Sequence, residues 1–140
     1  MSVQVRLLRR VAVAAAVLAL AAWAVPRFGI VFVGGWSMSP ALIPGDLVVY
    51  RRAAEATEGD VVLVARPGEA PFLHRVATVR LDGRLRTQGD ANDAADAEPA
   101  SPADVAGITV AVVPSGRAIH AALAGARWCY GRVPIANLRR

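Results

Sequence analysis

The sequence predicts a small, mainly β domain that follows one N-terminal transmembrane helix and ends in a short C-terminal helix. Three features indicate this: an apolar stretch near the N-terminus, a series of short β-like runs separated by turn residues, and an alanine-rich segment near the C-terminus. At 140 residues the chain is long enough for one domain with a core. We expect the N-terminus and anchor at 1–27, the β-rich domain at 28–114, and the helix and a basic tail at 115–140.

The apolar stretch at 11–25 is uninterrupted, but fifteen helical residues cover only about 22 Å of a hydrocarbon core of about 30 Å. Counting from Leu7 brings the length closer to a full span. Three arginines lie within residues 6–10, so the positive-inside rule places the N-terminus in the cytoplasm and the rest of the chain outside the cell membrane. The alternative is a cleaved signal peptide, because Ala22-Trp23-Ala24 fits an A-x-A cleavage site. We favour an uncleaved single-pass anchor.

From residue 28 the chain alternates between β-branched or aromatic runs and turn signals. Pro44-Gly45-Asp46, Gly59-Asp60 and Asp82-Gly83 are typical turns between such runs. The expected strands cover 28–33, 47–51, 61–66, 72–81, 84–87 and 107–113. A long loop is expected at 89–103, which is rich in Asp, Ala, Asn and Pro. Residues 115–130 are expected to form a helix that is too short and too charged to span a membrane.

The charge pattern excludes some classes of function. All 16 basic residues are arginines, and the formal net charge is +5. No stretch interleaves bases with aromatic residues as nucleic-acid modules do, so no nucleic-acid partner is expected. Basic segments beside an apolar one favour an anionic lipid surface instead. With Cys129 as the single cysteine, a cysteine-based zinc site is excluded, and we expect no metal and no other cofactor.

The segment GGWSMSPALIPGDLVVY, at 34–50, places Ser37 directly after two glycines and a tryptophan. A serine hydroxyl is a poor nucleophile unless a base removes its proton. The chain has no lysine, and arginine keeps its proton in proteins. Histidine is therefore the available base.

Only two histidines are present. His74 lies in the expected strand at 72–81, on the same face as Phe72 and Val76, with Arg75 on the other face. His120 lies among alanines in the expected C-terminal helix. Either histidine could be held by local hydrogen bonds, and we adopt this interpretation for His120, while both interpretations stay open for His74.

The run SMSPALIPGDLVVY, followed by HRV and then by GDANDAAD, resembles signal peptidase I. The likeness is to the branch found in the endoplasmic reticulum, in archaea and in some Gram-positive bacteria, in which a histidine-arginine strand replaces the lysine-arginine strand. It covers about residues 31–113. The resemblance implies a small antiparallel β domain behind a membrane anchor. It also implies a serine endopeptidase that removes N-terminal signal peptides at A-x-A-like sites, with preproteins and the lipid bilayer as partners.

The resemblance implies a role for each matching residue. Ser37 is the expected nucleophile, with its backbone N–H as an oxyanion donor, and His74 is the expected general base. Asp96, six residues after the Gly-Asp pair, is the expected orienter of the imidazole. Asp90 is the second choice, because it could instead be a turn residue that bonds its own backbone. The expected substrate-binding residues are Gly35, Trp36 and Met38.

One position departs from the family. The residue two before the serine is often another serine, whose hydroxyl helps to build the oxyanion hole, and here it is Gly35. Loss of one such donor costs about 10²–10³ in rate. Two alternatives therefore stay open: a dedicated maturation peptidase with few substrates, or a catalytically impaired membrane-anchored relative that binds partners.

One further alternative is a self-cleaving repressor-type protease of the same superfamily. Such a protease needs lysine and usually a DNA-binding domain, and the sequence shows neither.

The bulky residues Trp36, Met38 and Ile43 either contact lipid or belong to the core, and the sequence favours neither.

Overall fold

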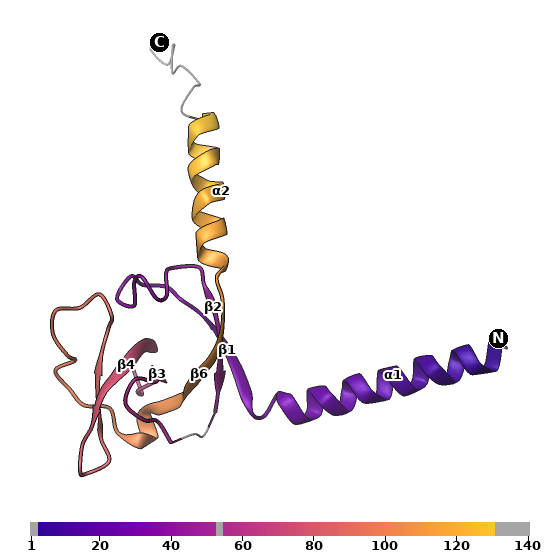
Figure 1. Cartoon of the computed structure of the whole chain (residues 1–140), viewed down its shortest axis with the longest axis horizontal. Helices are drawn as coiled ribbons and strands as arrows, with labels where there is room; N and C mark the ends of the chain where they lie inside the picture. The colour runs from indigo at the N-terminus through magenta and orange to yellow at the C-terminus, as the bar shows by residue number, and fades with distance from the viewer. Residues whose placement is uncertain (1–2, 53–54, 131–140) are drawn as a thin grey trace.

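The computed structural model describes residues 3–52 and 55–130, which form one antiparallel β-sheet with a helix at either end of the chain (Figure 1). The elements are α1 (Val3–Ala24), β1 (Phe28–Phe32), β2 (Leu47–Arg51), β3 (Val61–Val64), β4 (Phe72–Val79), β5 (Leu85–Gln88), the 3-10 turn η1 (Pro102–Asp104), β6 (Val105–Val113) and α2 (Ser115–Tyr130). The predicted mainly β fold with two flanking helices is confirmed, and each strand end lies within about two residues of its prediction. The basic tail expected after residue 130 lies outside the described residues.

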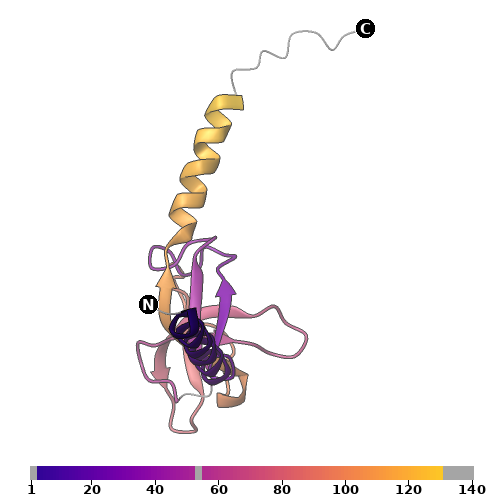
Figure 2. The ribbon, with the colours of Figure 1, turned by 90° about the vertical axis from the view of Figure 1, so that its right-hand side faces the viewer.

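Helix α1 is longer than the apolar run alone indicated. It begins at Val3, because the arginines and glutamine before residue 11 are good helix formers and no proline or glycine interrupts them. Its 22 residues span about 33 Å. The stretch Gln4–Ala24 is long and apolar enough to cross a membrane, and none of its most apolar window is buried. Figure 1 shows the helix projecting away from the sheet, and Figure 2 shows it nearly end-on.

The strand order of the sheet is β1-β2-β6-β3-β4-β5, with every pair antiparallel. The nine-residue β6 joins the two halves of the sheet, because its first part pairs with β3 and its second part with β2. Register shifts interrupt the β2–β6 ladder at Val49/Tyr50 and the β3–β6 ladder at Leu63/Val64. Such irregularities bend a sheet, and this bent sheet buries side chains on both of its faces.

Two hydrophobic clusters lie on opposite faces of β3. Leu63 belongs to one cluster, and its neighbours Val62 and Val64 belong to the other, as the alternation of side chains along a strand requires. The first cluster contains Val33, Met38, Leu42, Val48, Leu63 and Leu73. The second contains Val62, Val64, Val76, Leu85, Ala100 and Ile108. The wholly apolar sequence of β3 is thereby explained by burial on both faces.

Candidate active site

Ser37 lies in a short turn that is fastened to the first hydrophobic cluster. Its neighbour Met38 is only 1% exposed and packs in that cluster, so Met38 is a core residue rather than a lipid contact. The Ser39 N–H donates to the Trp36 carbonyl at 2.9 Å and closes the turn. The Ser37 carbonyl accepts the Ala91 N–H at 2.8 Å, which ties the turn to the loop after β5. The serine is therefore held from two sides.

His74 reaches Ser37 from β4. It pairs with Val62 in the β3–β4 register and shares a face with Phe72 and Val76, as predicted, while Arg75 lies on the other face. The imidazole Nε2 lies 3.2 Å from Ser37 Oγ. Its side chain is 10% exposed, and the Phe72 ring packs edge-on against it with 4.9 Å between centroids. The imidazole is thus largely shielded from water on the side of the core.

Asp96 completes the line on the far side of the imidazole. Its Oδ2 lies 2.7 Å from His74 Nδ1. An ionised carboxylate only accepts hydrogen bonds, so Nδ1 must carry the hydrogen, and Nε2 of the neutral ring is left to accept the Ser37 hydroxyl proton. The same Oδ2 accepts a 2.6 Å hydrogen bond from Thr87 Oγ1, and the Asp96 N–H donates to the Thr87 carbonyl at 2.8 Å.

The sequence reasoning missed Thr87. It is 1% exposed, and both its hydroxyl and its carbonyl hold Asp96 in place. The available signal was a threonine two residues after an inward-facing leucine in the β5 run, which puts a hydroxyl on the buried face of the strand.

The other candidate orienter, Asp90, has a different partner. Its two carboxylate oxygens accept hydrogen bonds from Arg75 Nε at 2.9 Å and Arg75 Nη2 at 2.7 Å. This bidentate pair raises the pKa of Arg75 above its ordinary value, mainly through the hydrogen bonding that Arg75 donates to Asp90. Arg75 Nη1 also donates to the Gly59 carbonyl at 2.9 Å. Of the two aspartates, Asp96 therefore lies beside His74, and Asp90 holds the loop after β5 to Arg75 of β4.

Gly89 is a second residue that the sequence reasoning missed. A Cβ at this position would lie 2.5 Å from the Ser37 carbonyl oxygen, 2.9 Å from Asn92 Nδ2 and 3.0 Å from His74 Nε2. Only a residue without a side chain lets the loop after β5 approach Ser37 and His74 so closely. The glycine of the Gly-Asp pair thus shapes the site more directly than the aspartate beside it.

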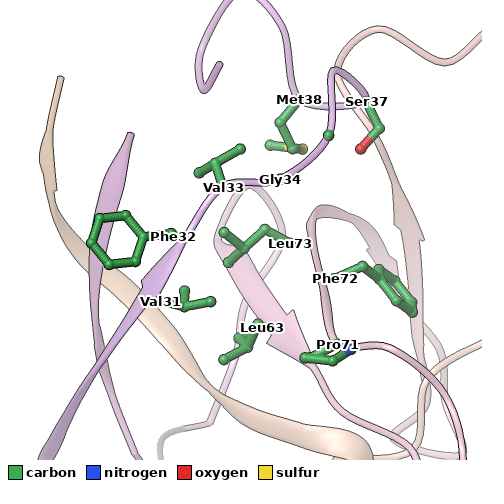
Figure 3. A pocket seen from close by; sticks show the side chains of 11 residues that line it. Val31, Phe32, Val33, Gly34, Ser37, Met38, Leu63, Pro71, Phe72 and Leu73 are labelled. Carbon is green, nitrogen blue, oxygen red and sulfur yellow. The ribbon is translucent and has the colours of Figure 1, made fainter. Parts of the chain in front are cut away.

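A pocket of about 240 Å³ opens beside Ser37, between the end of β1 and the beginning of β4 (Figure 3). Most of its lining is apolar and comes from Val31, Phe32, Val33, Gly34, Gly35, Ser37, Met38, Leu63, Pro71, Phe72 and Leu73. Figure 3 shows Ser37 at one end of this pocket, with Phe72 and Leu73 along its β4 side. Two of the three expected substrate-binding residues, Gly35 and Met38, are therefore in the lining.

The third, Trp36, does not line the pocket. It is 58% exposed, and its ring stacks at 5.5 Å on the ring of His120 from α2. His120 Nε2 donates to the Pro44 carbonyl at 3.0 Å, which confirms the interpretation of His120 as a locally hydrogen-bonded histidine.

The space beside Gly34 and Gly35, just before Ser37, is open. A Cβ added to Gly35 or to Gly34 would meet no atom within 4 Å. No hydrogen bond to another described residue engages the Ser37 N–H, so this group is available to a developing negative charge.

Taken together, the site holds a hydroxyl, a neutral imidazole and a carboxylate in line, which is the geometry of general-base activation of a nucleophile. No group of three or more His, Cys, Asp or Glu side chains that could hold a metal occurs within residues 3–52 and 55–130. A scan against protein-family models finds no match for the chain, and a search of the curated proteins finds none either. Function is therefore inferred from the geometry of the site.

Proposed function

We propose that the chain is a membrane-tethered serine endopeptidase of the signal peptidase I type, in its serine-histidine branch. The observation that supports this best is the hydrogen-bonded line from Ser37 Oγ through His74 to Asp96, with separations of 3.2 and 2.7 Å. Three residues far apart in the sequence lie in the order that acyl transfer requires, beside an apolar pocket of about 240 Å³.

In the proposed reaction, Ser37 Oγ attacks the carbonyl carbon of the scissile bond while His74 Nε2 takes its proton. Asp96, bonded to Nδ1–H, stabilises the imidazolium that forms and keeps the ring oriented. The imidazolium then gives the proton to the leaving amine nitrogen as the C–N bond breaks. Water, deprotonated by the same imidazole, attacks the acyl-enzyme ester and releases the signal peptide with a free carboxylate, restoring Ser37.

Strand edges next to the pocket suit an extended substrate. β1 is an edge strand of the sheet, and residues 72–74 of β4 pair only with β3, since the β5 ladder begins at Arg75. An extended peptide that adds to such an edge obtains its register from backbone hydrogen bonds. The apolar pocket of about 240 Å³ then accepts an apolar side chain of the substrate, and the alanines of an A-x-A-like site are among those that fit.

The anchor keeps this chemistry near the bilayer. Residues 25–37 reach at most about 45 Å when fully extended, and β1 uses part of that length inside the sheet. With the N-terminus in the cytoplasm, as the positive-inside rule favours, the site faces the extracytoplasmic surface of the cell membrane, where signal-peptide cleavage sites emerge.

Processing of a reporter preprotein with alanine at both specificity positions tests the proposal. Full-length wild type is compared with Ser37→Ala, His74→Ala and Asp96→Asn, each beside a matched control: Ser39→Ala, His120→Ala and Asp90→Asn. We expect the three site variants to lose at least 10³ in rate and the controls to lose less than tenfold. Activity is also expected to fall at acidic pH, because a protonated imidazole cannot accept the serine proton. Undiminished processing by Ser37→Ala would exclude a serine protease.

One observation favours a second candidate, a catalytically impaired relative that binds partners. The oxyanion hydroxyl of the family is absent at Gly35, and the space it would occupy is open. If wild type and Ser37→Ala are equally silent on every preprotein tested yet bind them alike, this candidate replaces the protease. A dedicated maturation peptidase has the same chemistry, and a panel of preproteins separates it from a general enzyme by substrate range.

A further inference from the structure

Three arginines gather where α1 meets the sheet, at the opposite end of β1 from Ser37. Arg27 lies between α1 and β1, and Arg51 and Arg52 stand at the end of β2. The antiparallel register pairs Arg51 with Phe28, and the Arg52 N–H donates to the Arg27 carbonyl at 2.8 Å. The tertiary fold therefore brings Arg27 beside the adjacent pair Arg51-Arg52, which lies far from it in the sequence.

These charges have no carboxylate partner in the part of the chain that the structure describes. All 11 aspartates and glutamates belong to that part. The ion pairs formed there by arginine involve Arg66, Arg75 and Arg80. Three neighbouring cations without a counter-charge repel one another, so an anion bound among them would be stabilised.

The guanidinium groups are partly fixed by the backbone. Arg27 Nη1 donates to the Trp23 carbonyl at 2.8 Å, and its Cζ lies 5.0 Å from the Trp23 ring centroid. Arg52 Nε donates to the Phe28 carbonyl at 3.2 Å. Since a guanidinium has five N–H donors, each side chain keeps several for a ligand, and holding it in place lowers the entropy that a ligand must overcome.

A pocket of about 410 Å³ lies among these residues. It is lined by Trp23, Pro26, Arg27, Phe28, Arg51 and Arg52. Half of this lining is arginine and half is aromatic or apolar. Such a lining suits a ligand that carries an anionic group next to an apolar chain.

The pocket also stands where a lipid headgroup would be found. Trp23 is in the last turn of the membrane-competent helix, and Arg27 follows the helix end by three residues. Tryptophan at a membrane interface lies at headgroup depth, and arginine binds phosphate oxygens with two parallel hydrogen bonds. We propose that this pocket binds the phosphate of an anionic phospholipid. A free phosphate shares the chemistry, but the lipid also uses Trp23 and Phe28 beside the acyl chains.

This site is independent of the protease proposal, since Phe28 and Phe32 at the two ends of β1 are about 14 Å apart. The test uses the full-length chain in a non-ionic detergent, titrated with short-chain phosphatidylglycerol, with phosphatidylcholine of the same chains, or with inorganic phosphate. Binding is measured by native mass spectrometry and by the shift of the thermal unfolding midpoint. The variant R27Q/R51Q/R52Q is compared with R80Q/R84Q/R86Q, which removes the same charge from the β4–β5 hairpin at the other side of the sheet.

We expect phosphatidylglycerol to bind wild type and the hairpin variant alike and to bind the junction variant at least tenfold more weakly. Phosphatidylcholine is expected to bind at least tenfold more weakly to wild type. Equal binding of phosphatidylglycerol by both triple variants would overturn the site. Equal binding of phosphatidylcholine, or saturation by inorganic phosphate at the same concentration, would overturn an anionic lipid as its ligand. If the junction triple variant does not fold, the single R51Q, whose side chain makes no hydrogen bond to another described residue, gives the same comparison with at least a threefold loss expected.

Discussion

Replacing Gly89 with alanine is expected to disable the site without removing any of its chemical groups. The new methyl would lie 2.5 Å from the Ser37 carbonyl oxygen and 3.0 Å from His74 Nε2. Ordinary contact is about 3.5 Å, so the Ser37 turn must retreat by about 1 Å and the imidazole by about 0.5 Å. These two shifts act on the two ends of a serine-histidine hydrogen bond that is already 3.2 Å long. A displacement of about 1 Å costs about 100-fold in rate, and we expect that loss in kcat/KM.

The measurement is steady-state processing of the reporter preprotein by the full-length variant, well below its unfolding midpoint. Overpacking costs about 1–3 kcal/mol of stability, so thermal unfolding is followed in parallel. Ala94→Val is the control, because it adds bulk at an exposed position of the same loop, and we expect it to retain at least half of the activity. If folded Gly89→Ala processes the reporter within threefold of Ala94→Val, close approach of this glycine does not set the geometry of the site.

Three further substitutions probe separate contacts. Thr87→Val, nearly equal in shape, removes the 2.6 Å hydrogen bond to Asp96; kcat should fall about tenfold while KM stays within twofold, and an unchanged kcat would refute a positioning role. Gly35→Ser adds a hydroxyl in open space two residues before Ser37. As a second oxyanion donor it should raise kcat at least tenfold over Gly35→Ala in the same assay; equal rates would show that it supplies no such donor. The two carboxylate oxygens of Asp46 accept the Gly116 N–H at 2.8 Å and the Ile43 N–H, and Asp46→Asn leaves one of these donors without its acceptor. The free energy of unfolding should fall by about 1–3 kcal/mol, and a change below about 0.5 kcal/mol measured by calorimetry would contradict this.

Local patterns predicted the elements of this chain well, for a physical reason. Turns such as Asp82-Gly83 depend on backbone conformations that few residues adopt, so they mark strand ends from within the sequence. The alternation along β4 likewise predicted that His74 and Val76 share a face, because side chains in any strand alternate. The length of α1 was underestimated, since only apolar residues were counted and the preceding arginines also favour helix.

Composition predicted part of the candidate site. With no lysine and only two histidines, few side chains could serve as a base for Ser37. Composition does not distinguish Asp96 from Asp90 as the partner of His74, because both lie in one loop within hydrogen-bonding reach of several partners. Their partners depend on where Arg75 and Thr87 place their donors, and those positions come from the pairing of β4 with β5.

By itself, then, the sequence determined which short segments become strands, that an apolar helix precedes them, and that Ser37 and His74 are the residues with suitable chemistry. Only the tertiary structure decided that β6 lies between β2 and β3, that Gly89 lies close against Ser37 and His74, and that a cluster of arginines forms where α1 meets the sheet. Turn and strand preferences act over a few residues and can be read along the chain. Contacts between distant segments depend on how all the strands pair and pack at once, so no local pattern contains them.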